Sequence, residues 1–118
     1  SFLSKIEEFV GYLNATCYTG INDFEFHYAL YDVGSFYKRH RDQFRSNAGR
    51  KYSLVSYLNE HWEESDGGHL SLYQNDQAIN LLPHGGRTVF FKSDEVEHEV
   101  HPSMNKPRLS ITGWLKSI

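Results

Sequence analysis

The sequence has a single cysteine, Cys17, so no disulfide can form within the chain. Disulfides are common in oxidising compartments and rare in the cytoplasm, so we expect a cytoplasmic protein. The sequence also lacks a signal peptide and an apolar run of membrane-spanning length, which predicts no membrane partner. It opens on Ser1 directly in a helical pattern, so we expect these residues to be part of a longer protein.

A large excess of positive charge is absent as well. The formal net charge is −3, which makes a nucleic-acid partner unlikely for the domain as a whole. Half of the basic residues nevertheless fall in one short segment: Lys38, Arg39, Arg41, Arg45, Arg50 and Lys51. This segment is either a solvated loop or a docking rim for an acidic partner, and the sequence alone leaves both interpretations open.

The letters HRDQFRSN at residues 40–47 match the catalytic loop of protein kinases, H-R-D-x-x-x-x-N. A chain of 118 residues is too short for a two-lobed kinase. The other kinase motifs, G-x-G-x-x-G, V-A-I-K and D-F-G, do not occur. The kinase interpretation is therefore excluded, and the chemistry of the H-x-D motif must be explained otherwise.

The first residues have helical periodicity. Phe2, Ile6, Phe9 and Leu13 recur at helical spacing, with Leu3 and Val10 beside them, which predicts an amphipathic helix. The pattern Ser4-x-x-Glu7 resembles a capping box at its start.

After residue 23 the apolar pattern changes to that of strands. Phe24, Phe26, Tyr28 and Leu30 alternate with polar residues and should share one strand face. Turn signals such as DGG, PHGG and NKP separate several of the strand candidates, which are 24–33, 35–42, 52–59, 68–73, 77–82, 87–92, 98–101 and 108–115. We predict one mainly β domain over residues 1–118, a double-stranded β-helix (jelly roll) with an N-terminal amphipathic helix.

Two of the strand candidates contain metal-ligating residue types. In an extended strand, residues i and i+2 point to the same face, so His40 and Asp42 should project together. A third ligand from another strand would complete the two-His-one-carboxylate triad of non-haem Fe(II) oxygenases. His98 and His101 are both candidates, and because they face opposite ways on a strand only one can join. The run HEVH is not the zinc-protease motif, since it is one residue too short.

The last strand candidate places a cation among residues that usually face a core. Arg108, Ser110, Thr112 and Trp114 should share one face. A buried arginine is costly unless it meets an anion, and its planar fork suits a carboxylate. A metal triad beside such an arginine indicates a dicarboxylate co-substrate, with one end on the metal and the other on Arg108.

Three blocks of the sequence now carry a resemblance: YDVGSFYKRHRD, YSLVSYLNEHWEESDGGHLSLY and GGRTVFFKSDEVEHEVHPSMNKPRLSITGW. With them the chain, from about Phe26 to Leu115, resembles the 2-oxoglutarate- and Fe(II)-dependent dioxygenases. Within these it is most similar to the prolyl 4-hydroxylase-like group, which includes the hypoxia-inducible-factor prolyl hydroxylases and bacterial relatives. The resemblance implies Fe(II), 2-oxoglutarate and O₂, release of succinate and CO₂, and support of activity by ascorbate.

The resemblance also implies roles for single residues. His40, Asp42 and His98 match the iron ligands, and Arg108 and Tyr57 match the residues that hold the distal carboxylate of 2-oxoglutarate. Tyr31 matches a tyrosine near the metal-chelating end of the co-substrate, while the remaining matches are pocket-wall positions: Leu70, Thr112 and Trp114.

The expected activity is hydroxylation of a protein substrate, most simply at a prolyl residue, with Arg45, Arg50 and Lys51 as a rim for acidic substrates. The segments after Asp42 and between His98 and Arg108 depart from the family pattern, which leaves the substrate open. One alternative is an AlkB-type nucleic-acid demethylase, but Trp114 stands where that group has a second arginine. The other is a jelly-roll module that binds metal without turnover.

Overall fold

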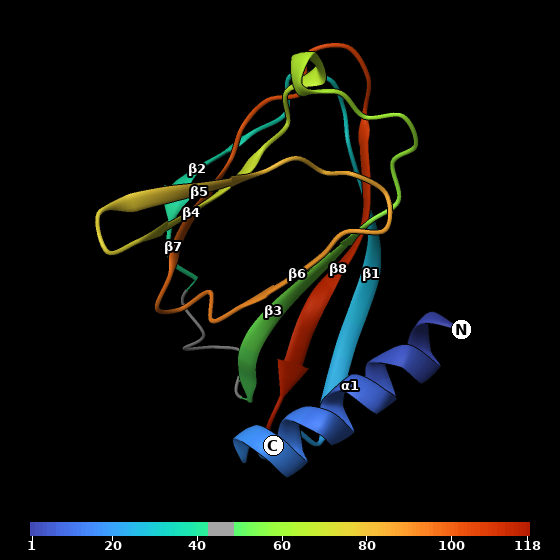
Figure 1. Cartoon of the computed structure of the whole chain (residues 1–118), viewed down its shortest axis with the longest axis vertical. Helices are drawn as coiled ribbons and strands as arrows, with labels where there is room; N and C mark the ends of the chain where they lie inside the picture. The colour runs from blue at the N-terminus through green and yellow to red at the C-terminus, as the bar shows by residue number, and fades with distance from the viewer. Residues whose placement is uncertain (43–48) are drawn as a thin grey trace.

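A computed structural model describes residues 1–42 and 49–118 (Figure 1). The mainly β prediction, the N-terminal helix and all eight predicted strands are confirmed, with shifts of one or two residues at most strand ends. The elements, in chain order, are α1 (Phe2–Cys17), β1 (Asp23–Tyr31), β2 (Tyr37–His40), β3 (Arg50–Tyr57), the 3₁₀ turn η1 (Glu64–Asp66), β4 (Leu70–Gln74), β5 (Gln77–Leu81), β6 (Thr88–Phe91), β7 (Glu97–Val100) and β8 (Arg108–Lys116).

The strands form two antiparallel sheets of four, which is the predicted jelly roll. The strand orders are β1-β8-β3-β6 in the first sheet and β2-β7-β4-β5 in the second. Figure 1 shows α1 lying against the side of the first sheet that faces away from the second sheet. The two sheets therefore share an interior that α1 does not enter. No helix among the described residues is long and apolar enough to span a membrane.

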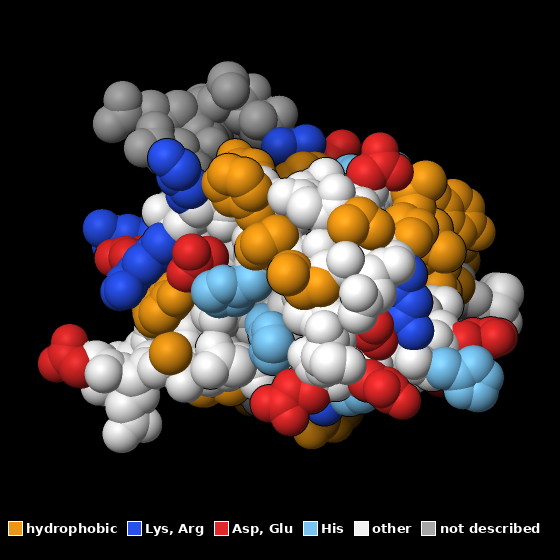
Figure 2. Space-filling model, turned by 90° about the horizontal axis from the view of Figure 1, so that it is seen from above, with side chains coloured by type: hydrophobic (Ala, Val, Ile, Leu, Met, Phe, Trp, Pro, Cys, Tyr) orange, Lys and Arg blue, Asp and Glu red, His pale blue; other side chains and the backbone are white. Residues whose placement is uncertain are grey.

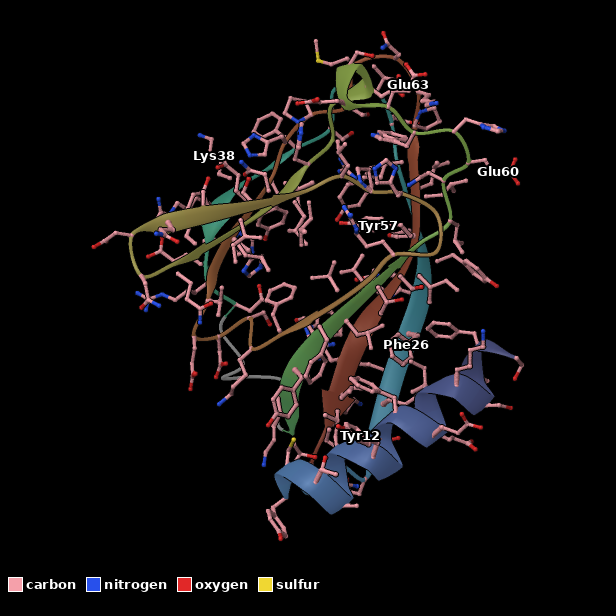
Figure 3. All side chains as sticks on the ribbon, viewed as in Figure 1. Tyr12, Phe26, Lys38, Tyr57, Glu60 and Glu63 are labelled. Atoms are coloured by element: carbon pink, nitrogen blue, oxygen red, sulfur yellow. The ribbon has the colours of Figure 1, made fainter. Side chains whose placement is uncertain are left out.

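The helix and the first sheet enclose one apolar core. Ile6 and Leu13 of α1 are buried together with Leu54 and Leu115 of the sheet, and Phe26 meets Phe2 edge to face at 5.3 Å between ring centroids. Figure 3 shows Phe26 directed from β1 towards α1. The predicted helical face is thus the buried face, since aromatic and aliphatic burial supplies most of the stability of a packed helix.

Two details of the predicted helix are wrong. The N-cap is Ser1, whose hydroxyl accepts a hydrogen bond from the Ser4 amide at 3.3 Å, so Ser4 does not begin a capping box with Glu7. The helix begins earlier because the first turn brings Phe2 onto the sheet. Leu3 is on the solvent side, 53% exposed.

The outer face of the first sheet extends beyond the helix. Phe24 and Phe26 are packed into the core with α1, whereas Tyr28 and Leu30, on the same face of β1, are 80% and 60% exposed. The strand order also puts β1 at the edge of its sheet, where it pairs with β8.

A second core lies between the sheets. Tyr57, Leu70 and Val89 are buried there, with Phe91 and Val100 packed against them. Figure 3 shows Tyr57 pointing into the space between the two sheets. The candidate site is formed by side chains that face this interior, which come from every strand except β5 among the residues described.

Gly113 provides a test of how closely β1 and β8 approach each other. A Cβ at Gly113 would overlap the carbonyl of Glu25 and lie 2.7 Å from Cδ1 of Phe26. We expect Gly113→Ala to lower the free energy of unfolding by about 1–3 kcal/mol or more, the usual cost of overpacking. The measurement is urea denaturation followed by circular dichroism.

Gly11, in the middle of α1, is the matched control because a Cβ there meets no atom within 4 Å. Gly11→Ala should raise the free energy of unfolding by about 0.5–1 kcal/mol, since alanine favours helix over glycine. If both substitutions shift the transition in the same direction, the close approach of β1 to β8 is not a determinant of stability.

Candidate active site

Strand pairing brings two histidines together. β2 pairs with β7 in a register that sets His40 opposite His98, and their ring centroids are 4.3 Å apart. Asp42 lies two residues past the end of β2, so the prediction that it belongs to the strand is wrong. Its amide instead donates to the carbonyl of Ser93 at 2.8 Å, and this bond holds the carboxylate beside the histidines.

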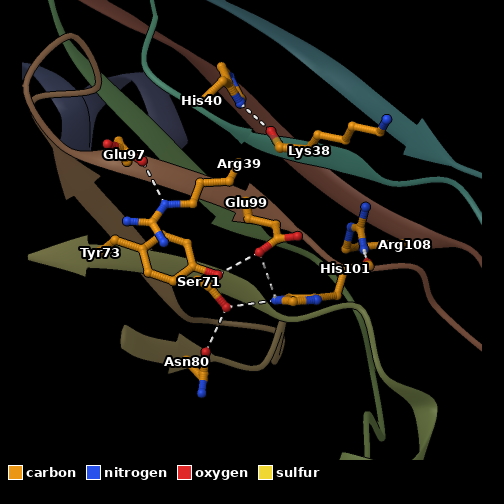
Figure 4. A network of polar contacts seen from close by, with 10 residues as sticks. All are labelled: Lys38, Arg39, His40, Ser71, Tyr73, Asn80, Glu97, Glu99, His101 and Arg108. Atoms are coloured by element: carbon orange, nitrogen blue, oxygen red, sulfur yellow. Dashed lines mark hydrogen bonds and ion pairs between the residues drawn. The ribbon is translucent and has the colours of Figure 1, made fainter. Parts of the chain in front are cut away.

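Both imidazoles are oriented by a backbone carbonyl. Nδ1 of His40 lies 2.7 Å from the Lys38 carbonyl, and Nδ1 of His98 lies 2.9 Å from the Val96 carbonyl (Figure 4 shows the former). A carbonyl can only accept, so Nδ1 carries the proton in each ring. Both Nε2 atoms are thereby directed at Oδ1 of Asp42, at 3.2 and 3.3 Å. This orientation of metal-binding histidines by backbone carbonyls is a common feature of metal sites.

The surroundings of Asp42 favour the charged form of its carboxylate. Burial acts to raise the pKa of Asp42, but hydrogen bonds from His98 and Ser93 outweigh it and hold that pKa below its usual range. Burial likewise acts to lower the pKa of His98, yet the Asp42 carboxylate and the Val96 carbonyl outweigh it and hold the pKa above its usual range. The ligand atoms of His40, Asp42 and His98 lie within 4.8 Å of one another, which is compact enough to hold one metal ion.

His101 lies on the other side of the second sheet. Its Nε2 is 2.8 Å from the hydroxyl of Ser71, which also donates to Asn80 at 2.6 Å (Figure 4). His98, by contrast, faces the interior and contacts Phe91 edge to face, with the ring centroids 5.0 Å apart. Of the two candidate histidines that the sequence offers, only His98 is within reach of His40 and Asp42.

Arg108, the first residue of β8, is a buried cation. Arg108 is 4% exposed. No ion pair between its guanidinium and an acidic residue is found in residues 1–42 and 49–118. Burial lowers the pKa of the guanidinium, an effect that Tyr57 and Tyr31 oppose. Within the same ranges its Nη2 is buried and has no hydrogen-bond partner. A cation in this state is a binding site for an anion.

Two tyrosines lie beside Arg108. Burial raises the pKa of Tyr57 to about 12, with the positive charges of Arg108 and Arg87 opposing the rise, so the Tyr57 hydroxyl remains a donor at neutral pH. The ring centroid of Tyr31 lies 4.9 Å from Cζ of Arg108. This contact is at the arginine end of the pocket, whereas the resemblance placed Tyr31 near the metal-chelating end.

One cavity of about 330 Å³ unites these residues, a volume at the lower end of small-molecule sites. All nine residues that the sequence assigned to metal or co-substrate line it: Tyr31, His40, Asp42, Tyr57, Leu70, His98, Arg108, Thr112 and Trp114. The sequence reasoning missed Tyr37, whose ring packs on His40 at 4.1 Å between centroids, and Ser53 and Val55 of β3. The alternation of β3 would have found the last two, because they share the face of Tyr57.

The predicted basic rim is only partly described. Arg45 lies outside the described residues. Arg50 is bound to Glu25 through an Nε–Oε1 contact of 2.5 Å, and its guanidinium stacks 3.6 Å from the ring centroid of Trp114. Lys51 is exposed. Figure 2 shows several Lys and Arg side chains at the left of the view with Asp and Glu side chains among them, and others at the top and on the right. Arg50 therefore contacts a pocket-lining residue, but Glu25 offsets its charge.

Comparison with known proteins agrees with this arrangement. Residues 26–116 match the family described as the 2OG-Fe(II) oxygenase superfamily. Among curated proteins, the prolyl 3-hydroxylase OGFOD1 of Xenopus laevis is 36% identical over 76 residues, which cover 56% of this chain and 15% of that protein. The chain therefore spans only a small part of the curated relatives it matches.

Two solved structures are similar over nearly the whole chain. A prolyl-4-hydroxylase of Pseudomonas putida is 41% identical with a TM-score of 0.92, and the match covers 99% of this chain and 64% of that one. A prolyl hydroxylase of Trichoplax adhaerens, in complex with a hypoxia-inducible-factor oxygen degradation domain peptide fragment, is 28% identical with a TM-score of 0.85. That match covers 98% of this chain and 55% of the other.

The geometry predicts which histidine binds metal. We expect Asp42→Ala and His98→Ala to weaken Mn²⁺ binding by more than about 100-fold, beyond the 10–100-fold typical of changes outside the ligand set. His101→Ala should retain Mn²⁺ affinity, because His101 is on the far side of the sheet. Calorimetric titration of the metal-free protein with Mn²⁺ measures this. Retention of binding in His98→Ala together with its loss in His101→Ala would contradict the assignment.

Proposed function

The chain belongs to the 2OG-Fe(II) oxygenase superfamily, and we propose that it acts as a 2-oxoglutarate- and Fe(II)-dependent dioxygenase that hydroxylates a prolyl residue of a protein substrate. The observation that carries the proposal is the pairing of two features in one cavity. The His40–Asp42–His98 cluster opens into it, and so does Arg108, a buried cation whose Nη2 has no partner in residues 1–42 and 49–118.

The His40–Asp42–His98 cluster fits Fe(II). Two imidazoles and one carboxylate are the donor set of the facial triad, which leaves coordination positions for the co-substrate and O₂. Both imidazoles would offer Nε2 to a metal ion, since Nδ1 of each ring donates to a backbone carbonyl. We assign His40, Asp42 and His98 as the ligands.

The arginine end of the cavity fits the distal carboxylate of 2-oxoglutarate. Arg108 offers Nη2, and the neutral hydroxyl of Tyr57 can donate a second hydrogen bond. The walls supplied by Leu70 and Val100 are apolar and exclude water from the carbon chain between the two ends.

When bound, Fe(II) and 2-oxoglutarate supply the oxidising chemistry, in which O₂ delivers one oxygen atom to the substrate and one to succinate, with release of CO₂. The residues of this chain bind and orient. Asp42, whose pKa is held low, stays a carboxylate, and the Lys38 and Val96 carbonyls orient the histidine rings. Arg108 would hold the distal carboxylate of 2-oxoglutarate, so that the keto-acid end of the molecule lies at the His40–Asp42–His98 cluster.

The similar proteins support a prolyl residue as the target. The curated relative is a prolyl 3-hydroxylase, and the two solved structures are prolyl hydroxylases, one of them with a peptide bound. The alternatives have less support. Trp114 stands where AlkB-type enzymes have a second arginine, and the guanidinium of Arg50 stacks on its ring. A module without turnover has no use for a buried arginine and tyrosine that converge in the metal cavity.

We also infer that residues 1–118 form a single domain and that the protein resides in the cytoplasm. α1 packs on the first sheet, and Tyr57 and Val89 of the first sheet are buried together with Leu70 of the second. The one thiol, Cys17, is exposed and free, a condition that suits a reducing compartment.

Arg108→Ala should weaken 2-oxoglutarate binding far more than metal binding. Removing one partner of a buried charge pair costs about 2–5 kcal/mol, or roughly thirty- to several-thousand-fold in affinity. Tyr57→Phe removes a single hydrogen bond and should cost about 0.5–3 kcal/mol. The measurement is calorimetry of 2-oxoglutarate with the Mn²⁺-loaded protein. Small and equal effects of both substitutions would rule out this pair as the carboxylate site.

The substrate is tested by mass spectrometry of candidate proteins for a one-oxygen addition that requires 2-oxoglutarate. We expect the oxygen on a prolyl residue in a loop with acidic neighbours, and catalytic efficiency that falls as salt rises, since charge steering is screened over about 8 Å at 0.15 M. Lys38 and Lys51 are exposed, so Lys38→Ser with Lys51→Ser should lower efficiency on the protein substrate.

The control for this pair is Lys5→Ser on α1, remote from the cavity. Arg50 is left in place because its substitution would also disturb Trp114. Uncoupled turnover of 2-oxoglutarate should be unchanged in all of these variants. Modification of a residue other than proline would refute the prolyl assignment, and equal efficiency of the two sets of variants would refute the acidic preference.

A further inference from the structure

The guanidinium of Arg108 is held by two backbone carbonyls. Its Nη1 donates to the carbonyl of Gly68 at 3.2 Å and to the carbonyl of His101 at 3.1 Å. An Nη nitrogen has two hydrogens, so both hydrogens of Nη1 are used. Because the group is planar, these two bonds fix the plane and leave Nη2, which has no hydrogen-bond partner among the residues described, available to a ligand.

The first carbonyl belongs to a segment that Trp62 holds in place. Gly68 has φ of +73°, and a Cβ there would lie 3.0 Å from Nη1 of Arg108 and 3.1 Å from Cζ2 of Trp62. The indole Nε1 of Trp62 donates to the carbonyl of Gly67 at 2.9 Å, and Trp62 is itself buried. Gly68 is thus enclosed between the tryptophan and the arginine, with no room for a side chain.

The second carbonyl is held from the outer face of the second sheet. The His101 amide donates to the carbonyl of His69 at 2.9 Å, and its side chain bonds to the buried hydroxyl of Ser71. Figure 4 shows the His101 side chain joined to Ser71 while its backbone meets Arg108. The two carbonyls therefore come from segments that are each anchored by a side chain outside the cavity.

We propose that Trp62, Gly68 and His101 are positioning residues that orient Arg108 so that Nη2 faces the distal carboxylate of the co-substrate. The proposal rests on the proposed function, since it takes Arg108 to be the carboxylate site. A guanidinium that is already fixed loses less freedom when the carboxylate binds, so the affinity of the site depends on this support.

Gly68→Ala is the direct test, because the added methyl group would displace Nη1. We expect 2-oxoglutarate to bind about ten- to a hundredfold more weakly, the effect usual for residues that orient a binding group. The affinity for 2-oxovalerate, which has a methyl group in place of the distal carboxylate, should not change, and neither should that for Mn²⁺. All affinities are measured by calorimetry, those of the two oxoacids on the Mn²⁺-loaded protein.

Gly20→Ala is the matched control. Gly20 has φ of +67°, so alanine is equally strained there, but its Cβ would meet only the Ser117 hydroxyl at 3.7 Å, an ordinary contact. Two milder variants test the supports without touching Gly68. Trp62→Phe removes the bond to Gly67, and His101→Ala removes the bond to Ser71. Each should weaken 2-oxoglutarate selectively, by less than Gly68→Ala does, and they decide the question if Gly68→Ala does not fold.

Arg108→Ala distinguishes a failure of the positioning role from a failure of the proposed function. If it weakens 2-oxoglutarate no more than 2-oxovalerate, Arg108 is not the carboxylate site and the proposed function loses its main support. If it discriminates between the two oxoacids while Gly68→Ala, Trp62→Phe and His101→Ala bind both as the Gly20→Ala control does, only the positioning role is refuted. Equal weakening of both oxoacids in Gly68→Ala would likewise refute it, since that result means general distortion of the cavity.

Discussion

The pairing of β2 with β7 in the register that opposes His40 and His98 is the constraint on which the site depends. Side chains alternate along a strand, so a slip of one residue would turn His40 out of the cavity and leave His98 without its partner. Only a short stretch of β2 enforces this register, and the bond from the Asp42 amide to Ser93 extends it past the strand end. Backbone hydrogen bonds of the fold therefore hold His40, Asp42 and His98 together.

The second requirement of the site is the buried positive charge of Arg108. Taking an unpaired guanidinium out of water is costly, and the backbone carbonyls of Gly68 and His101 meet only part of that cost. The neutral Tyr57 beside it adds a donor and no negative charge. An anionic ligand thus completes the site electrostatically, which explains why a small domain can keep such a group in its interior.

Much of this could be predicted from the sequence, for reasons that lie in local patterns. The alternation of Arg108, Ser110, Thr112 and Trp114 gives the inner face of β8, and the three sequence blocks give the family and the ligands. The choice between His98 and His101 followed from strand geometry together with the resemblance. The helix start was missed because a cap is decided by the packing of Phe2 on Phe26, which no local pattern contains.

Contacts between segments that are distant in the sequence could not be predicted from it either. The stacking of Arg50 on Trp114 and the bond from Arg108 to the Gly68 carbonyl join residues far apart in the sequence, so neither spacing nor composition indicates them. The basic residues near the metal strand show the same limit. Their number indicated a rim, but the pairing of Arg50 with Glu25 depends on the register of β1 and β3 against β8.

The exposed end of β1 affects how this chain behaves in concentrated solution. An edge strand presents unpaired backbone donors and acceptors, and apolar side chains beside them favour pairing with another chain. β1 combines a sheet edge with exposed Tyr28 and Leu30 and has no proline or lysine along its length. Among the strands described, β1 is therefore where self-association of this domain is expected to begin, and a charged residue at position 28 or 30 would oppose it without altering the cavity.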